Sequence, residues 1–290
     1  MMPDKLNILT FDIEEWVVYQ QYPKGGKDYY LPILDEYLDK LLALLKVKGV
    51  KATFFCLGKV AEEYPYVIKK IVDHGHEIGC HSYEHKFVTQ MTRDEFYNDT
   101  LKAKRILEEV SGQNIIAYRA PAFSFTETNQ WVFIVLAELG FEYDCSVFPS
   151  SRSFGGFPSF PTIGPVIIDI NGYKLKELPI NISVIAGLSI PFSGGGYFRL
   201  LPYWLIGSEL KKNDYIMSYF HIRDFDAKQK QVKSLRYFKS YYGIKSAFDK
   251  LSRYINENDF VSLYTASDRI DWSKVEVYNI NDFLFNTEIA

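Results

Sequence analysis

The sequence predicts an α/β fold in which a parallel sheet is covered by helices, and three observations lead to this expectation. Segments typical of strands and of helices alternate through most of the 290 residues. Several residues with reactive side chains directly follow predicted strands, and in a (β/α) barrel that end of the strands carries the active site. The composition is 47% hydrophobic, which is sufficient for one large core or two small ones.

The first half of the chain alternates regularly between the two kinds of element. Leucines at helical spacing follow Pro32 until Gly49 ends the helix, and ATFFCL has the composition of a buried strand. Thr92 and Glu95 have the spacing of a capping box, which opens a helix that runs to Gly112. The predicted strands are Leu6–Phe11, Ala52–Leu57, Glu77–Cys80 and Ile115–Tyr118, and the other helices are Pro32–Lys48, Ala61–Asp73 and Glu127–Leu139.

The alternation weakens between about residues 150 and 198, where we expect an inserted loop and β-hairpin. Residues 150–165 are rich in Ser, Gly, Phe and Pro, and Asn171-Gly172 lies between two strand-like runs, which is typical of a hairpin turn. A tail covers about residues 268–290, and we expect a single domain over residues 1–290. The elements predicted in this half are Val166–Ile170, Tyr173–Leu178, Leu201–Lys212, Tyr215–His221, Val232–Asn256 and Phe260–Tyr264.

Composition and charge argue against several classes of protein. A net charge of −3 without a long basic block makes a nucleic-acid partner unexpected. No window of about 18 residues is apolar and uncharged, so we expect no transmembrane segment. The three cysteines, Cys56, Cys80 and Cys145, are widely spaced and odd in number, which favours a reducing compartment. Because the N-terminal residues lack the pattern of a signal peptide, we expect a cytoplasmic protein of unknown oligomeric state.

Two clusters of polar side chains could together bind a metal ion. Asp12, Glu14 and Glu15 end an apolar strand, where three acids are costly to bury without a compensating charge. His81 and His85 are four residues apart, so one helical turn would place both on the same face. Two imidazoles and a carboxylate are a common ligand set for a catalytic divalent metal. Taken separately, the acids could equally form a solvated loop, and such a histidine pair is only moderately specific.

Two further residues at predicted strand ends are candidates for the chemistry. Arg119, in YRAPAFS, could fix the position of a carboxylate, and Pro121 makes the next turn rigid, so a backbone N–H there could face an oxyanion. His221, in YFHIRDFD, could protonate a leaving amine, because histidine titrates near neutral pH. Each signal is weak alone, and a hydrogen-bonded core histidine is the commoner explanation of an isolated residue such as His221.

Taken in order, the motifs TFDIEEW, HEIGCHSYEH, YRAPAFS and YFHIRDFD resemble those of the polysaccharide deacetylase family, the NodB-homology or carbohydrate esterase 4 group. The resemblance spans roughly residues 6–265, and its most specific part is HSxxH preceded by G-H-E-I-G. The forms DxEE, RAPAFS and PFSGGGYFRLLP are more similar to the subgroup from bacterial exopolysaccharide and lipopolysaccharide gene clusters than to secreted chitin deacetylases. The resemblance implies a distorted (β/α) barrel with seven strands rather than eight.

The resemblance also implies a role for individual residues. Asp12 corresponds to the general base of the family, and Arg119 corresponds to the arginine that holds this base. His81 and His85 correspond to the two histidines that bind the metal. His221 corresponds to the general acid.

Departures from the family's motifs leave some roles open. Asp-Ile-Glu-Glu replaces the usual adjacent pair of aspartates, so the third metal ligand is either Glu14, which we prefer, or Glu15. Alanine replaces the usual tyrosine after the proline of the third motif, so the oxyanion donor would be the backbone N–H of Ala122 or Phe123. The acid that orients the last histidine has no clear match, and Glu177, in KELPI, is our prediction.

With these roles, the sequence predicts a metal-dependent hydrolase that removes N-acetyl groups from an amino sugar. The expected substrate is a bacterial surface polysaccharide or its N-acetylated sugar precursor, and the expected cofactor is a divalent metal ion, with Zn²⁺ as the first choice. Two alternatives stay open. One is hydrolysis of another small amide, such as a formamido sugar or a ring amide, and the other is a sugar-binding relative without catalysis.

Overall fold

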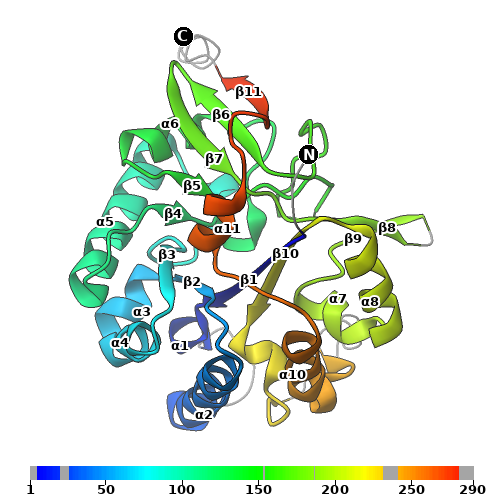
Figure 1. The fold of residues 1–290 in the computed structure, drawn as a ribbon. Helices are drawn as coiled ribbons and strands as arrows, with labels where there is room; N and C mark the ends of the chain where they lie inside the picture. Colours follow the sequence, from blue (N-terminus) through cyan, green and yellow to red (C-terminus); the bar gives the residue numbers. More distant parts are fainter. Residues whose placement is uncertain (1–4, 20–25, 153, 186, 231–240, 281–290) are drawn as a thin grey trace.

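The main sheet of the protein contains nine strands among the residues that the computed structural model describes, which are 5–19, 26–152, 154–185, 187–230 and 241–280. The order of the strands across the sheet is β10-β1-β2-β3-β4-β5-β7-β6-β11 (Figure 1). Their bounds are β1 Leu6–Ile13, β2 Thr53–Cys56, β3 Glu77–Cys80, β4 Ala117–Tyr118, β5 Tyr143–Asp144, β6 Val166–Ile170, β7 Tyr173–Glu177, β10 Tyr215–His221 and β11 Glu276–Ile280.

The first seven strands in this order, from β10 to β7, are all parallel to their neighbours. This arrangement confirms the predicted α/β fold with seven parallel strands. The sheet continues past β7 with β6, which is antiparallel to β7, and ends with β11. Within the described residues no ladder joins β10 to β11, so the sheet is open where a regular barrel would close.

The helices form because apolar residues recur on one side and defined residues end them. In α2 (Lys27–Lys48), Leu34, Leu38 and Leu45 are buried, and Gly49 ends the helix with a left-handed φ of 65°. In α5 (Arg93–Ser111), Thr92 forms the predicted capping box. The other helices are α1 Glu15–Val18, α3 Gly58–Glu63, α4 Pro65–Asp73, α6 Trp131–Glu138, α7 Gly195–Leu200, α8 Tyr203–Lys212, α10 Ala247–Glu257 and α11 Leu263–Arg269.

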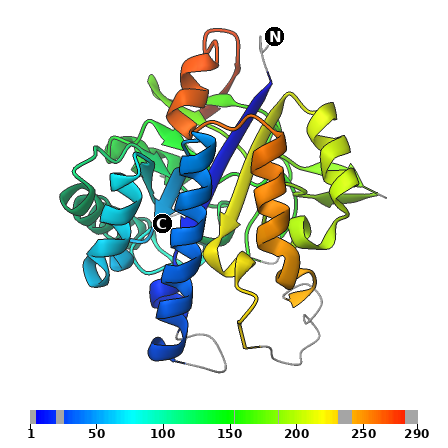
Figure 2. The same cartoon turned by 60° about the horizontal axis from the view of Figure 1, so that its bottom comes forward.

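Helices cover the outer side of the parallel strands. Figure 1 shows α2 to α6 in an arc beside the first five strands of the chain, and Figure 2 shows α2 and α10 side by side in front of β1 and β10. Between the helices and the strands, apolar residues from nearly every element form one continuous core. Among the described residues, none of the helices has the length and apolar character needed to cross a bilayer.

The predicted hairpin forms, but it is part of the main sheet and not an insertion outside it. Asn171 and Gly172 both have positive φ, 51° and 97°, as a tight two-residue turn between β6 and β7 requires. Strand β7 then pairs in parallel with β5, so this half of the hairpin supplies the seventh parallel strand. A second hairpin, β8 (Ser183–Ile185) with β9 (Leu188–Ile190), was not predicted.

Some predicted elements differ from those observed. The helix expected at Ala61–Asp73 is two helices, α3 and α4, because Pro65 restricts the backbone of the residue before it. The strand expected at Phe260–Tyr264 is wrong: only an isolated bridge from Val261 to Ile8 forms, and α11 begins at Leu263. Of the helix predicted at Val232–Asn256, the part from Ala247 onward is observed as α10. Residues 231–240 lie outside the described residues. The expected tail contains β11, and residues 281–290 again lie outside.

Candidate active site

Three of the predicted residues meet because they lie at the carboxyl ends of parallel strands of one sheet. Asp12 is paired with His221 in the ladder of β1 and β10, and with Phe55 in the ladder of β1 and β2. Arg119 directly follows β4 and lies deep in the core, with no exposed surface. The carboxyl ends of these strands therefore bring residues from the beginning, middle and end of the chain to one edge of the sheet.

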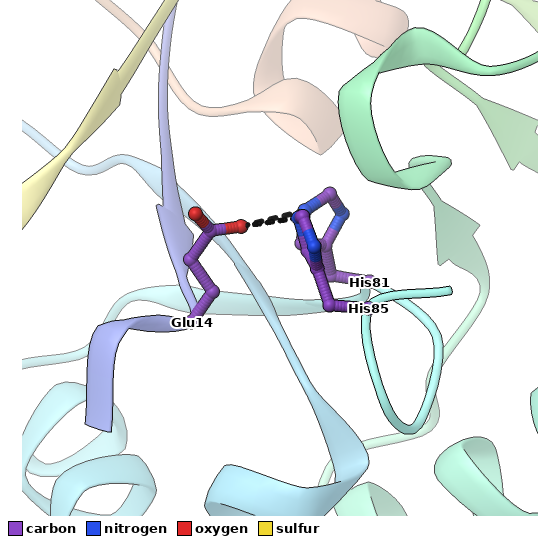
Figure 3. Close-up of side chains that lie close together, drawn as sticks. All are labelled: Glu14, His81 and His85. Carbon is purple, nitrogen blue, oxygen red and sulfur yellow. Dashed lines mark ion pairs between the residues drawn. The ribbon is translucent and has the colours of Figure 1, made fainter. Parts of the chain in front are cut away.

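Glu14, His81 and His85 form a cluster with the geometry of a metal site. One ligand atom from each lies within 4.8 Å of the other two. Glu14 Oε2 is 2.6 Å from His85 Nε2 and 3.5 Å from His81 Nε2, and Figure 3 shows the three side chains pointing toward one another. The loop carrying the histidines is not the predicted helical turn, because Ser82 and His85 have left-handed φ values of 69° and 62°.

The donor set and its surroundings fit a divalent ion such as zinc. His81 Nδ1 lies 2.7 Å from the carbonyl oxygen of Arg119, so an N–H at this position would leave Nε2 with a lone pair facing Glu14. Burial opposes ionisation of Glu14, but His85 and His221 hold the pKa of this carboxyl well below its usual range. Burial alone would lower the pKa of His85, but the charge and the hydrogen bond of Glu14 have the larger combined effect and raise this pKa above its usual value. Two nitrogens and one ionised carboxylate leave room for water and substrate on a four- or five-coordinate ion.

Glu15, the alternative ligand, lies outside this cluster. Strand β1 ends at Ile13 and helix α1 begins at Glu15, so the side chains of Glu14 and Glu15 diverge. The buried Glu15 Oε1 accepts a hydrogen bond from the backbone N–H of Arg223 at 3.3 Å. Burial and the neighbouring Glu14 raise the pKa of Glu15 to about 8.

Asp12 and Arg119 form a buried ion pair beside the cluster. Arg119 Nη1 donates to Asp12 Oδ1 at 2.8 Å and to Thr10 Oγ1 at 2.7 Å. The guanidinium also lies over the ring of Phe55, 4.1 Å from its centroid. An arginine held in this way leaves the second oxygen of Asp12 directed to the site, 3.8 Å from His221 Nε2.

His221 is oriented by Asp224 and not by Glu177, so that prediction is wrong. Asp224 Oδ2 is 3.2 Å from His221 Nδ1 and accepts the backbone N–H of His221 at 3.0 Å. Asp224 is itself paired with Arg199, on α7. Burial opposes protonation of His221, but Glu14, Asp224 and Asp12 hold its pKa well above the usual value. These three acids therefore favour the imidazolium, with Nε2 facing Asp12 and Glu14.

Glu177 belongs to a separate pair of buried carboxyl groups. It faces Asp144, its neighbour in the ladder of β5 and β7, and its Oε1 accepts the backbone N–H of Val147 at 3.2 Å. Asp144 in turn accepts from Ser146 Oγ at 2.5 Å, and Ser146 Oγ accepts the backbone N–H of Ala120 at 2.8 Å. The pair therefore supports the backbone just after Arg119 instead of contacting His221.

Of the two predicted oxyanion donors, only Ala122 remains a candidate. The N–H of Phe123 donates to the carbonyl of Ala120 at 3.1 Å, so it is already used. Both Ala122 and Phe123 have a φ of 53°, which places this short segment in the left-handed region. Such a conformation costs free energy in residues other than glycine, and it is often found at functional sites.

A cleft of about 800 Å³ opens onto part of this site, and its size is typical of small-molecule sites. Its floor includes Glu14, Glu15, His221 and Asp224. Sequence reasoning missed most of its walls, which come from the loop after residue 147, from β9 and α7, and from the turn after β10. The wall residues are Phe148, Ser151, Arg152, Phe154, Ser189, Pro191, Gly196, Tyr197, Arg199, Arg223 and Gln229.

The two halves of the chain match two different family models. Residues 2–143 match the model for polysaccharide deacetylase, and residues 145–267 match a domain of unknown function, DUF3473. The metal-site residues and Arg119 lie in the first match, whereas His221, Asp224 and Arg199 lie in the second. Strands from both matches lie side by side in the main sheet, since β10 pairs with β1 and β7 pairs with β5.

Curated relatives match over short segments. A peptidoglycan-N-acetylglucosamine deacetylase from Bacillus cereus is 42% identical over 77 residues, which cover 27% of this chain and 28% of the relative. A peptidoglycan deacetylase from Helicobacter pylori is 33% identical over 111 residues, which cover 38% of this chain and 36% of the relative. The chain therefore spans only about a third of the length of these relatives.

Solved structures match over nearly the whole chain. A proposed polysaccharide deacetylase from Mycobacterium smegmatis has a TM-score of 0.68 at 20% identity, covering 97% of this chain and 96% of that one. A carbohydrate esterase 4 pseudoenzyme from Bacillus anthracis has a TM-score of 0.51 at 15% identity, covering 97% of this chain and 70% of that one. At these identities the likeness shows a shared fold and, since one of the two is a pseudoenzyme, does not by itself show catalysis.

Proposed function

The chain carries a domain of the polysaccharide deacetylase family, and from this premise we propose that it hydrolyses the N-acetyl group of an amino sugar in a surface polysaccharide or its precursor. The observation that carries the proposal is the convergence of three sets of groups. His221 Nε2 lies 3.9 Å from Glu14 Oε1, in the candidate metal cluster, and 3.8 Å from Asp12 Oδ2, in the buried ion pair. A proton acceptor, a proton donor and metal ligands therefore surround one small space.

The metal ligands in this proposal are Glu14, His81 and His85. The metal is a divalent ion, and zinc is the preferred candidate. When bound, such an ion polarises the acetyl carbonyl and makes a neighbouring water molecule more acidic. Asp12 accepts a proton from the attacking water through Oδ2, because Arg119 occupies Oδ1 and holds the carboxylate in place. The N–H of Ala122 is the backbone donor proposed for the oxyanion.

His221 completes the reaction in this proposal by protonating the departing nitrogen. The hydroxyl of the water joins the acetyl carbon, the C–N bond breaks, and the amine takes its proton from His221 Nε2. A neutral amine is a far better leaving group than its anion, so the step depends on a protonated imidazole. The raised pKa of His221 and its contact with Asp224 support this role.

The cytoplasmic location expected from the sequence stays a prediction.

The proposal is tested by acetate release from N-acetylated oligosaccharides, with metal content measured on the same sample. Zinc-loaded protein should release acetate, a chelator should abolish release, and added zinc or cobalt should restore it. Asp12→Asn should lose most of the activity and keep the metal, since Asp12 is not a proposed ligand. Release that survives the chelator, or a fully active Asp12→Asn variant, would contradict the mechanism. Release of formate from an N-formylated sugar, with no release of acetate from its N-acetylated counterpart, would favour another amide substrate.

A further inference from the structure

One arginine on the wall of the cleft has no acidic partner in the described part of the chain. Arg152 is exposed and lines the same cleft as Glu14 and His221. Its guanidinium lies over two aromatic rings, 4.5 Å from the centroid of Phe148 and 5.3 Å from that of Phe123. Among the described residues, no carboxylate lies within the 4.0 Å of an ion pair with it. Stacking fixes the plane of a guanidinium but leaves the N–H groups at its edge available to a ligand.

The backbone that carries Arg152 is docked onto the segment beside the candidate oxyanion donor. The N–H of Gly156 donates to the carbonyl of Phe123 at 3.2 Å, and the N–H of Arg152 donates to the carbonyl of Gly155 at 3.2 Å. A Cβ at position 155 would lie 2.3 Å from the carbonyl oxygen of Phe123, so only glycine allows this approach. The backbone at Arg152 is therefore anchored beside this segment.

The acidic residues of the cleft are already engaged. Glu14 contacts the two histidines, and Asp224 is paired with Arg199 and His221. Glu15 is buried at the floor of the cleft, where its carboxyl group accepts a hydrogen bond from the backbone N–H of Arg223. Arg223, which also lines the cleft, donates through Nε to Gln229 Oε1 at 3.2 Å, so the exposed positive charge of Arg152 is the clearest feature that the wall presents to an incoming anion.

We propose that Arg152 forms an anion subsite and that the substrate is an acidic N-acetylated saccharide, with a carboxylate or phosphate group close to the acetylated sugar. This inference rests on the proposed function for the reaction itself. A planar guanidinium matches the two oxygens of either anion with parallel hydrogen bonds. Phe154, 48% exposed on the same wall and 5.2 Å from the ring of Phe87, offers an apolar face to a sugar ring beside the anion.

The test compares acidic and neutral saccharides that carry the same acetylated sugar. The probes are a hyaluronan tetrasaccharide, which alternates glucuronate with N-acetylglucosamine, N-acetylchitotetraose, which is neutral, and UDP-N-acetylglucosamine, which carries a diphosphate. Dissociation constants are measured by calorimetry on metal-free protein, so that turnover does not interfere. We expect at least one acidic probe to bind roughly twofold to fivefold tighter than the neutral one, the upper part of the range measured for exposed ion pairs. The preference should weaken as salt is added.

Matched variants assign this preference to one side chain. Arg152→Gln should remove it and Arg152→Lys should keep part of it. Arg269→Gln, a control, should leave it unchanged. Arg269 is exposed on α11, which begins beside Thr53 and Glu77 at the opposite ends of the strands.

The outcomes separate this inference from the proposed function. Equal binding of all three probes, binding of none, or an acidic preference that survives Arg152→Gln would overturn the anion subsite. Acetate release by the metal-loaded protein would leave the proposed function standing in each of those cases. An acidic preference that depends on Arg152, without acetate release under any metal, would instead support the subsite and contradict the proposed hydrolysis.

Discussion

Replacing Asp224 with asparagine tests which acid controls the proposed proton donor. The asparagine keeps the size of the side chain and an oxygen that can still accept the Nδ1–H of His221. It removes the negative charge from a group that lies 3.2 Å from that nitrogen. Because the imidazolium is stabilised by nearby anions, its pKa must fall when one of them is neutralised.

The size of the fall follows from the separation of the two groups. Two unit charges 3.2 Å apart attract by about 5 kcal/mol at an effective dielectric constant of about 20. At about 1.4 kcal/mol per pKa unit, this energy corresponds to a pKa change of about 4. This is an upper limit, because the asparagine oxygen still hydrogen-bonds the ring, and Glu14 and Asp12 still face Nε2. We therefore expect the pKa of His221 to fall by roughly 1 to 3.

The assay is a pH titration of the histidine side chains by ¹H–¹⁵N NMR, with His221→Ala used to assign the resonance. In the enzymatic assay, the alkaline limb of the pH–rate profile should move down in pH by the same amount. The matched control is Glu177→Gln, which neutralises the acid first expected to orient His221 and should leave its pKa in place. An unchanged pKa in Asp224→Asn, or an equal change in Glu177→Gln, would refute the reasoning.

Two other predictions concern the metal and the buried carboxyl pair. Glu14→Ala should weaken zinc binding at least about tenfold, because even the loss of a residue that only hydrogen-bonds to a metal ligand lowers metal affinity by that factor. Glu15→Ala should retain the metal. Elemental analysis after dialysis measures both, and equal losses would argue against Glu14 as the ligand. Burial and Asp144 raise the pKa of Glu177 well above its usual value, and burial raises that of Asp144 to about 6. Above about pH 4, these two carboxyl groups therefore bind more protons in the folded protein than in the unfolded chain. Because of this difference, their contribution to the free energy of unfolding falls as the pH rises. Glu177→Gln should flatten the decline in thermal stability between about pH 5 and pH 8, and an unchanged slope would contradict it.

The residues brought together by strand ends could be predicted from the sequence. Asp12, His81, Arg119 and His221 each follow an apolar run, and parallel strands present these ends at one edge. The choice between Glu14 and Glu15 could not be made on that basis, because both immediately follow the strand. It depends on the backbone turning from β1 into α1 between them, which is a feature of local geometry and not of residue type.

The partner of His221 left a local signal that the sequence interpretation did not use. Asp224 lies three residues after His221, and that spacing lets its carboxylate reach back to the backbone N–H of His221, as in a capping box. Glu177 was predicted although no motif identified the orienting acid, and the parallel pairing of β7 with β5 places it elsewhere. The contact of Arg199 with Asp224 joins residues 25 positions apart through tertiary packing, and no local pattern indicates it.

The division of the site between two family matches gives the second half of the chain a definite part in it. Residues 2–143 contain the candidate metal ligands and the Asp12–Arg119 pair, but this segment alone leaves β1 without β10 and therefore without a group facing Asp12 from that side. Residues 145–267 supply that strand, together with the histidine at its end, the Asp224–Arg199 pair that holds it, and most of the cleft wall. If the proposed reaction is correct, a chain that keeps only the first segment should still contain every metal ligand and have no proton donor for the leaving amine. The segment of unknown function would then be the part of the protein that converts a metal site into a hydrolase and selects its substrate.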